Sequence, residues 1–423
     1  MSTAVPSTIL IYATTASPRL LYVLDFIFGE RLRMHWTLCT DPTQFQQHTG
    51  YKISYTPQAI AHEIHLPSST LLFETQIRPL QKEELQSDPL AMVFFLLTRY
   101  EEYLAFESDK HGRFSIHSST LFTPEDFWRP IVDEFIYKLR KSILSKYPEI
   151  FIHQSKFTVR PTMDIDQFYL YQNLPRWRFA AGMMKSALKF DTTTIRARWS
   201  GLTSKEKDPW DVYDYLLQKG RMGHRWRLFL LNATYAKFDK NIPLKHPKIQ
   251  LVLQQLAKYH QIGIHPSYAS NKYLAKIAKE KNLLSQIVQK KIEISRQHYI
   301  KLHLPQTYRN LLTQGILHDF SMGFADGIGF RAGTSHSFLW YDLPKEEVTA
   351  LRIHPFCVMD VALKNYLQYT PDQASQKLDE LVEVLKVYGG KFTFILHNQS
   401  FSGYAEWKNW KPVFERWVSS FTH

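Results

Sequence analysis

The chain of 423 residues has only two cysteines, Cys39 and Cys357, which are too few for a disulfide scaffold and lack metal-site spacing. No stretch approaches the ~20 consecutive apolar residues that span a bilayer. The first residues lack a basic region, and the apolar run at 9–13 is too short for the core of a signal peptide. No GxGxxG or Walker sequence follows any expected strand. We therefore expect a cytoplasmic protein with no transmembrane segment and no phosphate-binding loop.

Acidic residues are outnumbered, 39 against 52 basic residues, which leaves a net charge of +13. This surplus attracts anionic partners, such as nucleic acid, an anionic membrane or a phosphate-bearing sugar donor. The basic residues concentrate at 185–198 and 271–291, and in the second stretch apolar residues recur at helical spacing, as in a helix with one solvated face. We expect no specific nucleic-acid partner, and peripheral contact with an anionic membrane stays open.

The first 150 residues are expected to form a smaller α/β domain of unknown role. Residues 7–13 have the pattern of a buried strand, and 89–107 and 125–147 have helical periodicity. Residues 99–115 are dense in polar and aromatic groups, and we interpret them as a surface helix with its turn rather than as a binding site.

From residue 151 to 423 the pattern alternates strand and helix, which predicts an α/β fold with a parallel sheet. About seven strands in this length favour a deformed (β/α) barrel, in which the site forms at the carboxyl ends of the strands. The best-defined helix follows Thr370, with Gln373 completing a capping box and Gly389 ending it. The expected strands are 156–164, 226–234, 261–265, 291–298, 315–321, 350–356 and 391–398.

Polar side chains gather at the carboxyl ends of five of these strands. Asp164 and Asp166 are two residues apart, so an extended chain presents both on one face. One carboxylate and two imidazoles form a suitable set of ligands for zinc or a similar divalent ion. Metal-assisted hydrolysis of an amide or ester is the chemistry that these parts support. The residues at the strand ends are Asp164, Asp166, His265, Arg296, His298, Asp319 and His397.

Each of these residues also has a purely structural interpretation. The two acids could cap the next helix and pair with Arg160, and the histidines could be turn or core residues with satisfied hydrogen bonds.

The motifs and their order resemble the polysaccharide deacetylase family, also called the NodB-homology or carbohydrate esterase family 4 fold. The motifs are TMDID (162–166), GIHPSYAS (263–270), SRQHY (295–299), DFSMG (319–323) and ILHNQS (395–400). The resemblance covers about residues 156–423, and it is strongest to a bacterial branch with an uncharacterised N-terminal domain. It implies a metal-dependent hydrolase, usually with zinc, that removes N- or O-acetyl groups from a sugar, glycan or glycan precursor. By this match Asp164 is the base, Asp166 a metal ligand and His397 the general acid.

The sequence departs from the family pattern at the second motif, where a second histidine is expected four residues after His265 but Ala269 stands there. We expect His298 to supply the missing ligand, with Ser267 and Ser270 as weaker alternatives. If no residue replaces it, the chain is a catalytically impaired glycan-binding or scaffolding protein that keeps the deacetylase barrel.

The family arginine that orients the base has two candidates in this chain. By order along the chain Arg296 fits this role, whereas Arg331 in GFRAGTSHSF resembles the local motif. We assign Arg296 to the base and Arg331 to substrate contact, with Asp319 and Tyr268 as further substrate-binding candidates.

Overall fold

The computed structural model describes residues 8–60, 62–203 and 206–419. The expectation about a signal peptide falls partly on residues 1–7, which lie outside this description. No helix in the described ranges is long and apolar enough to cross a membrane.

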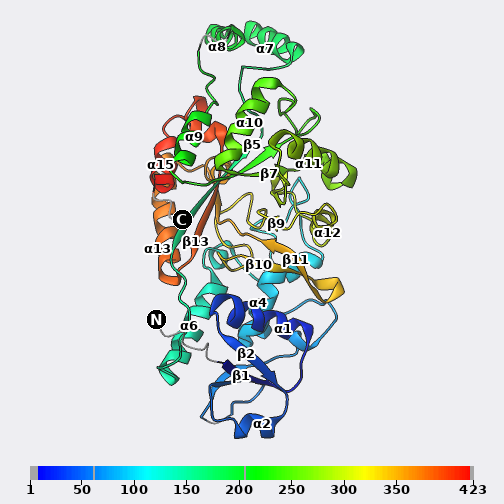
Figure 1. Cartoon of the computed structure of the whole chain (residues 1–423), viewed down its shortest axis with the longest axis vertical. Coiled ribbons are helices and arrows are strands. Elements are labelled where there is room, and N and C mark those ends of the chain that lie inside the picture. The colour runs from blue at the N-terminus through cyan, green and yellow to red at the C-terminus, as the bar shows by residue number, and fades with distance from the viewer. Residues whose placement is uncertain (1–7, 61, 204–205, 420–423) are drawn as a thin grey trace.

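A small sheet of four parallel strands forms from the first part of the chain, in the order β2-β1-β3-β4. In Figure 1 it lies at one end of the long axis of the molecule. Its strands are β1 (Thr8–Ala13), β2 (His35–Cys39), β3 (Lys52–Thr56) and β4 (Ile64–Pro67).

A larger sheet of nine strands forms from residue 158 onward, in the order β10-β11-β9-β8-β7-β6-β5-β13-β12. All neighbours pair in parallel except β10 and β11, which form an antiparallel hairpin. The strands are β5 (Thr158–Ile165), β6 (Arg227–Leu231), β7 (Gln261–His265), β8 (Ile294–Ser295), β9 (His318–Asp319), β10 (Phe338–Asp342), β11 (Glu347–Ile353), β12 (Val358–Met359) and β13 (Lys391–His397).

The expected barrel of about seven parallel strands is corrected in two respects. The sheet has nine strands, and within the described ranges its two outer strands, β10 and β12, do not pair with each other, so closure into a barrel is not confirmed. The strands expected from the sequence did not include β10, which is joined to β11 by a tight hairpin turn in which Glu346 adopts φ 54°.

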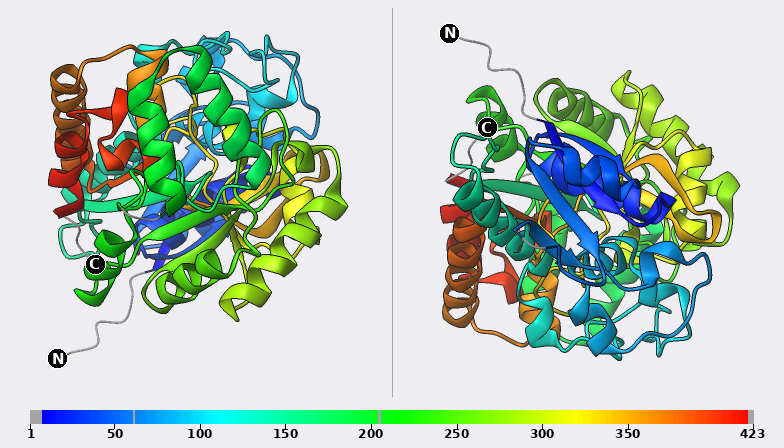
Figure 2. Two further views of the ribbon diagram at one scale, coloured as in Figure 1. Left: turned by 90° about the horizontal axis from the view of Figure 1, so that it is seen from above. Right: turned by 90° about the horizontal axis from the view of Figure 1, so that it is seen from below.

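Helices lie around the large sheet, as the two end-on views in Figure 2 show, and α1 and α4 lie between the two sheets in Figure 1. The helices are α1 (Pro18–Leu24), α2 (Pro42–Gln47), α3 (Lys82–Ser87), α4 (Pro89–Thr98), α5 (Pro124–Phe127), α6 (Ile131–Lys146), α7 (Arg176–Leu188), α8 (Thr192–Thr203), α9 (Tyr213–Arg221), α10 (Pro247–Tyr259), α11 (Leu274–Val288), α12 (Gln306–Thr313), α13 (Pro371–Tyr388), α14 (Asn398–Ser402) and α15 (Lys411–Ser419).

Local signals in the sequence explain where several helices begin and end. The capping box expected for α13 is confirmed, because Thr370 and Gln373 exchange hydrogen bonds and Gly389 ends the helix at φ 64°. The helix expected at 125–147 is confirmed over α6, but it is not continuous: Pro130 has no N–H to donate, and the chain forms α5 and α6 on either side of it.

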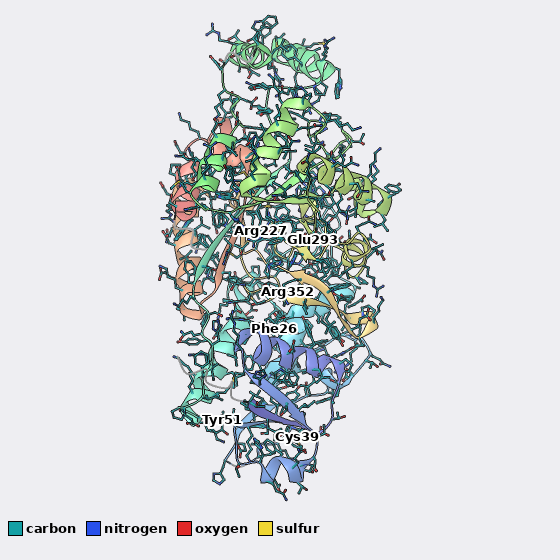
Figure 3. The ribbon with its side chains drawn as sticks, in the orientation of Figure 1. Phe26, Cys39, Tyr51, Arg227, Glu293 and Arg352 are labelled. Carbon is teal, nitrogen blue, oxygen red and sulfur yellow. The ribbon has the colours of Figure 1, made fainter. Side chains whose placement is uncertain are left out.

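One continuous cluster of buried apolar side chains extends from Ile9 in the small sheet to Val418 in the last helix. Polar contacts cross the same boundary: Arg352 of β11 donates to both oxygens of Glu30 at 2.9 Å. Figure 3 labels Arg352 on the part of the large sheet that is nearer the small sheet, Cys39 on the small sheet and Phe26 between them. The first 150 residues are therefore packed against the large sheet.

Candidate metal centre and active site

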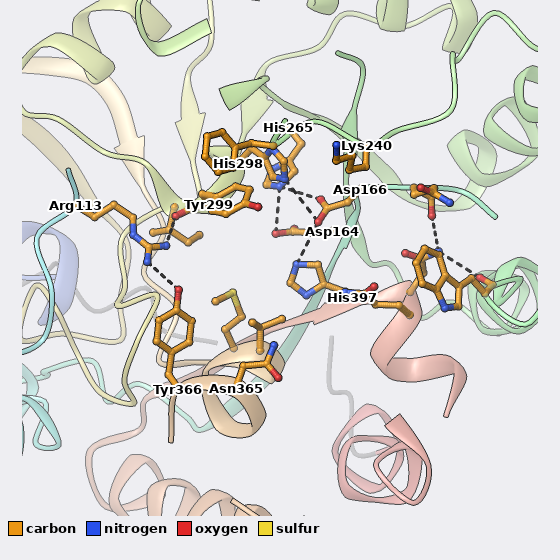
Figure 4. Close-up of a pocket in the computed structure, with 18 of the residues that line it drawn as sticks. Arg113, Asp164, Asp166, Lys240, His265, His298, Tyr299, Asn365, Tyr366 and His397 are labelled. Atoms are coloured by element: carbon orange, nitrogen blue, oxygen red, sulfur yellow. Dashed lines mark hydrogen bonds and ion pairs between the residues drawn. The ribbon is translucent and has the colours of Figure 1, made fainter. Parts of the chain in front are cut away.

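A cavity of about 500 Å³ opens at the carboxyl ends of the central strands of the large sheet. Five residues that the sequence placed at strand ends line it together, and Figure 4 shows their side chains converging. Asp164 of β5 lies between partners on both neighbouring strands, since it pairs with His397 on β13 and Phe229 on β6. The five residues are Asp164, Asp166, His265, His298 and His397.

Three of these residues present metal-ligating atoms to one point. The ligand atoms of Asp166, His265 and His298 all lie within 4.8 Å of one another. Nε2 of His265 is 3.3 Å from Oδ1 of Asp166, and Nε2 of His298 is 3.7 Å from Oδ2 of the same carboxylate. Both imidazoles therefore face the carboxylate across a gap, as ligands around an ion would.

Hydrogen bonds on the far side of both rings fix their tautomers. Nδ1 of His265 donates to the carbonyl oxygen of Arg296 at 2.6 Å, and Nδ1 of His298 donates to Oδ1 of Asp239 at 3.0 Å. Because Nδ1 of each ring donates outward, Nε2 of each ring is directed at the cluster, and loss of the proton on Nε2 leaves a lone pair there for a metal ion.

Burial, hydrogen bonding and charge also make Asp166 suitable as a ligand for a cation. Its Oδ1 is buried without a hydrogen bond of normal geometry. Burial favours the neutral carboxyl, but His298, His265 and His397 hold the pKa of Asp166 well below its usual value, so the group is an anion. The three residues thus fit a divalent ion in charge, donor type and orientation.

Asp164 lies beside this cluster and is held by an arginine. Nη1 of Arg296 donates to Oδ1 of Asp164 at 2.6 Å, while Oδ2 remains 3.8 Å from Nε2 of His265. Arg296 itself is fully buried, donates from Nε to the carbonyl oxygen of Phe320 at 3.0 Å and lies over the ring of Phe229. The guanidinium is fixed, and it in turn fixes one oxygen of Asp164 and leaves the other facing the cavity.

His397 lies on the opposite side of the cavity from His298 (Figure 4). Its Nδ1 donates to Asp360 at 2.8 Å, and Nε2 is directed into the cavity, 3.8 Å from Oδ2 of Asp166. Burial alone would lower the pKa of His397, but the carboxylate of Asp360 outweighs it and raises this pKa to about 10. His397 is therefore arranged to carry a proton and present it to the cavity.

Asp239 and Asp360, which hold the outer nitrogens of His298 and His397, were missed from the sequence. Asp360 directly follows β12, a two-residue strand that was not expected, and Asp239 lies in the long loop after β6. The strand-end rule would have found Asp360 had β12 been recognised.

The three residues expected to contact substrate do not line the cavity. Arg331 is buried and makes a bidentate ion pair with Glu102 at 2.6 and 2.8 Å, so the substrate contact assigned to it is not supported. Asp319 is buried and accepts hydrogen bonds from Ser295 and Ser321, which join β8 to the segment after β9.

The ring of Tyr268 lies behind the cavity wall. It packs against Phe238, and its hydroxyl is 3.2 Å from Nδ1 of His111. Phe238 lines the cavity, so Tyr268 supports the wall without forming it.

Residues 99–115 were expected to be a surface helix, and this is wrong. They form the 3-10 turn η3 (Tyr100–Tyr103) and a loop that reaches the cavity, where Arg113 is buried and lines the wall. Arg113 donates to the carbonyl oxygen of Tyr299 at 2.7 Å and to the hydroxyl of Tyr366 at 3.0 Å. Because none of these partners is near in sequence, no local pattern could have revealed the contact.

Comparison with known proteins gives a match to one family model, a family of unknown function (DUF7033), over residues 9–148. No curated protein matches the chain.

Several solved structures are similar to the chain at low identity. The Puue allantoinase is 11% identical with a TM-score of 0.41, over 64% of this chain and 88% of its own. The Bc1960 peptidoglycan N-acetylglucosamine deacetylase is 10% identical with a TM-score of 0.32, over 63% and 83%. BA3943, a CE4 family pseudoenzyme from Bacillus anthracis, is 8% identical with a TM-score of 0.32, over 63% and 62%. Similarities at this level carry no argument about activity, which must come from the site itself.

Proposed function

We propose that the chain is a metal-dependent hydrolase that removes N- or O-acetyl groups from a sugar, glycan or glycan precursor. The observation that carries this proposal is the meeting of Asp166, His265 and His298 around one point beside Asp164 and His397. The strand-end motifs that resemble the polysaccharide deacetylases supply the expectation of an acetylated sugar.

A divalent ion held by Asp166, His265 and His298 would polarise the acetyl carbonyl and acidify a water molecule, and two imidazoles with one carboxylate suit zinc. We infer that His298 replaces the histidine that is missing at Ala269, and the 3.7 Å distance from its Nε2 to Oδ2 of Asp166 supports this. This favours an active enzyme over the alternative of an impaired glycan-binding protein.

Two residues of the chain carry out the two proton transfers, Asp164 as the base and His397 as the acid. Asp164 takes a proton from the water that attacks the acetyl carbon, and Arg296 holds Asp164 in place for this transfer. The bond from the acetyl carbon to the sugar nitrogen or oxygen breaks, and Nε2 of His397 protonates the departing amine or alcohol. Acetate and the deacetylated sugar are the products.

We also propose that the chain has two domains, 1–150 and 151–423, with the first closing one side of the site through Arg113. A cytoplasmic location belongs to the same proposal, and it would present glycan precursors rather than finished polymer as substrates.

Acetate release from a panel of acetylated sugars and glycan precursors, with divalent metal supplied, tests the activity. We expect release by the wild type and almost none by Asp164→Asn. Release that is absent from the metal-loaded wild type, or undiminished in Asp164→Asn, would contradict the proposal.

A further inference from the structure

Two helices, α7 and α8, project from the end of the molecule opposite the small sheet (Figure 1). Together they form an antiparallel hairpin of residues 176–203, which we call the α7–α8 hairpin. Helices on the surface of a globular protein normally turn their apolar face toward a core. The two helices of this hairpin do the opposite.

The apolar residues of α7 form an exposed stripe. Trp177, Ala181, Met184 and Leu188 are spaced at four, three and four residues, so they share one face of the helix. All four are exposed, Leu188 by 76%.

The stripe continues around the turn and into α8. Phe190 in the connecting turn is 89% exposed, and Trp199 and Leu202 on α8 are more than half exposed. Six of the sixteen large apolar side chains that are exposed in the described part of the chain belong to this hairpin. Such concentration marks an interaction surface, because singly scattered apolar residues are the normal case.

Small residues occupy the inner faces of the hairpin. Ser186 is buried, and a side chain at Gly182 would collide with the guanidinium of Arg198. A side chain at Gly201 would meet the Cβ atom of Tyr171 at 2.6 Å. Small residues therefore lie where α7 meets α8 and where α8 meets the segment before α7, while the large apolar side chains lie outside.

The charge of the hairpin is strongly basic. Six basic residues face a single acidic one, Asp191, which accepts a hydrogen bond from the N–H of Thr194. Basic residues interleaved with tryptophan, leucine and phenylalanine are typical of helices that lie in the interface of an anionic membrane. The basic residues are Arg176, Arg178, Lys185, Lys189, Arg196 and Arg198.

The hairpin is connected to the rim of the cavity at both of its ends. Arg178 in the first turn of α7 lines the cavity and donates to Oε1 of Gln167 at 2.8 Å. Trp210, seven residues after the end of α8, lines the cavity as well. A partner that binds the hairpin therefore lies close to the mouth of the cavity.

We propose that the α7–α8 hairpin binds the surface of a membrane containing anionic phospholipids, and so places the mouth of the cavity next to the lipid headgroups. Its apolar stripe enters the boundary between headgroups and acyl chains, while its exposed basic residues, Arg176, Lys185, Lys189 and Arg196, contact phosphate. A substrate attached to a lipid would then reach the cavity without leaving the membrane. The binding itself does not depend on the hydrolase proposed above, because it needs neither metal nor turnover.

Co-sedimentation of the full chain with phosphatidylcholine vesicles, with and without phosphatidylglycerol, tests this at physiological ionic strength. We expect the wild type to bind the vesicles that contain phosphatidylglycerol and to bind neutral vesicles far more weakly. Removal of two apolar anchors in Leu188→Ser/Phe190→Ser should weaken binding by about tenfold or more. Removal of two charges in Lys185→Gln/Lys189→Gln should weaken binding to anionic vesicles only.

A matched control changes two exposed apolar residues elsewhere, in Leu251→Ser/Val387→Ser, and should bind like the wild type. Equal weakening in this control, or failure of the wild type to bind anionic vesicles, would overturn the proposal. Sedimentation velocity without lipid tests whether a second copy of the chain covers the hairpin instead. If the wild type is a dimer that Phe190→Ser dissociates, and it does not bind vesicles, the surface is a dimer interface and the membrane proposal is wrong.

Discussion

Parallel pairs make up the whole of the small sheet and most of the large one, yet polar residues after the strands serve different purposes in the two sheets. In the small sheet, Ser17 follows β1 and accepts from the N–H of Leu20, and Asp41 follows β2 and accepts from the N–H of Thr43. These side chains cap α1 and α2. In the large sheet, the equivalent side chains face one another across a cavity.

The difference shows what makes a strand-end residue a candidate for function. An oxygen or nitrogen that caps a helix is already satisfied, whereas Nε2 of His265 and Nε2 of His298 face the cavity because other groups hold Nδ1. Helix-capping residues and candidate functional residues both occur at the ends of strands, and only their hydrogen bonds distinguish the two kinds.

The largest effect is expected from the base. Replacement of Asp164 by Asn keeps the shape of the side chain and its contact with Arg296 but removes the basic oxygen, so kcat for acetate release should fall by about 10²–10⁴-fold. Metal content, measured on the same preparation, should remain that of the wild type. Loss of metal together with activity would instead make Asp164 a ligand.

A smaller effect is expected from the carboxylate that holds His298. Asp239→Asn weakens the hydrogen bond to Nδ1, which should raise the dissociation constant for zinc by about 10–100-fold. Competition with a chromogenic chelator measures it. The matched change in the small sheet, Asp41→Asn, should leave zinc affinity unchanged; if both variants weaken it equally, the contrast between the sheets fails.

His260 offers a histidine of the opposite kind within the large domain. Its Nε2 donates to the carbonyl oxygen of Leu216 at 2.9 Å and Nδ1 accepts from the N–H of Trp226 at 3.2 Å, so both nitrogens are used in the neutral form. Burial lowers its pKa to about 4 from an unfolded value of about 6.5.

Between these two pKa values the unfolded chain binds a proton at His260 that the folded chain does not. Stability from this residue is therefore complete above pH 6.5, falls as the pH is lowered toward 4 and changes no further below it. Between pH 7 and pH 5 the loss should be about 2 kcal/mol. Urea unfolding at both pH values should show this loss in the wild type and less of it in His260→Gln; an equal loss in both would contradict the assignment.

The smallest effect is expected from a cap in the small sheet. Asp41→Ala removes the acceptor for the N–H of Thr43 and should cost about 1 kcal/mol of unfolding free energy. Acetate release should be unchanged, since this cap has no contact with the cavity. If Asp41→Ala remains folded but loses activity, the small sheet is coupled to the cavity, which would contradict the distinction drawn between the two sheets.

Much of the site could be predicted from the sequence because it obeys the period of a strand. Asp164, His265 and His397 end strands that were correctly located, and their shared face follows from strand geometry. His298 was reached by its order along the chain, although it lies in the turn η5 (His298–Ile300) rather than at a strand end.

What the sequence could not give are contacts between distant segments. The pairing of Arg331 with Glu102 joins residues 229 positions apart, and it turns an expected substrate contact into a buried ion pair. Arg113 reaches the cavity in the same way, from a stretch that was interpreted as a surface helix with its turn. Patterns along the chain report which face a residue occupies, and they do not report which remote segment covers that face.

Metal analysis of the purified chain is the most direct test of the central claim, that His298 completes a site with Asp166 and His265. After incubation with zinc and gel filtration at neutral pH, the wild type should retain one equivalent, while His298→Ala and His265→Ala should both fall well below it. The control His260→Gln, a buried histidine whose two nitrogens are already used, should retain zinc like the wild type. Failure of the wild type to retain zinc, or full retention by His298→Ala, would contradict the account.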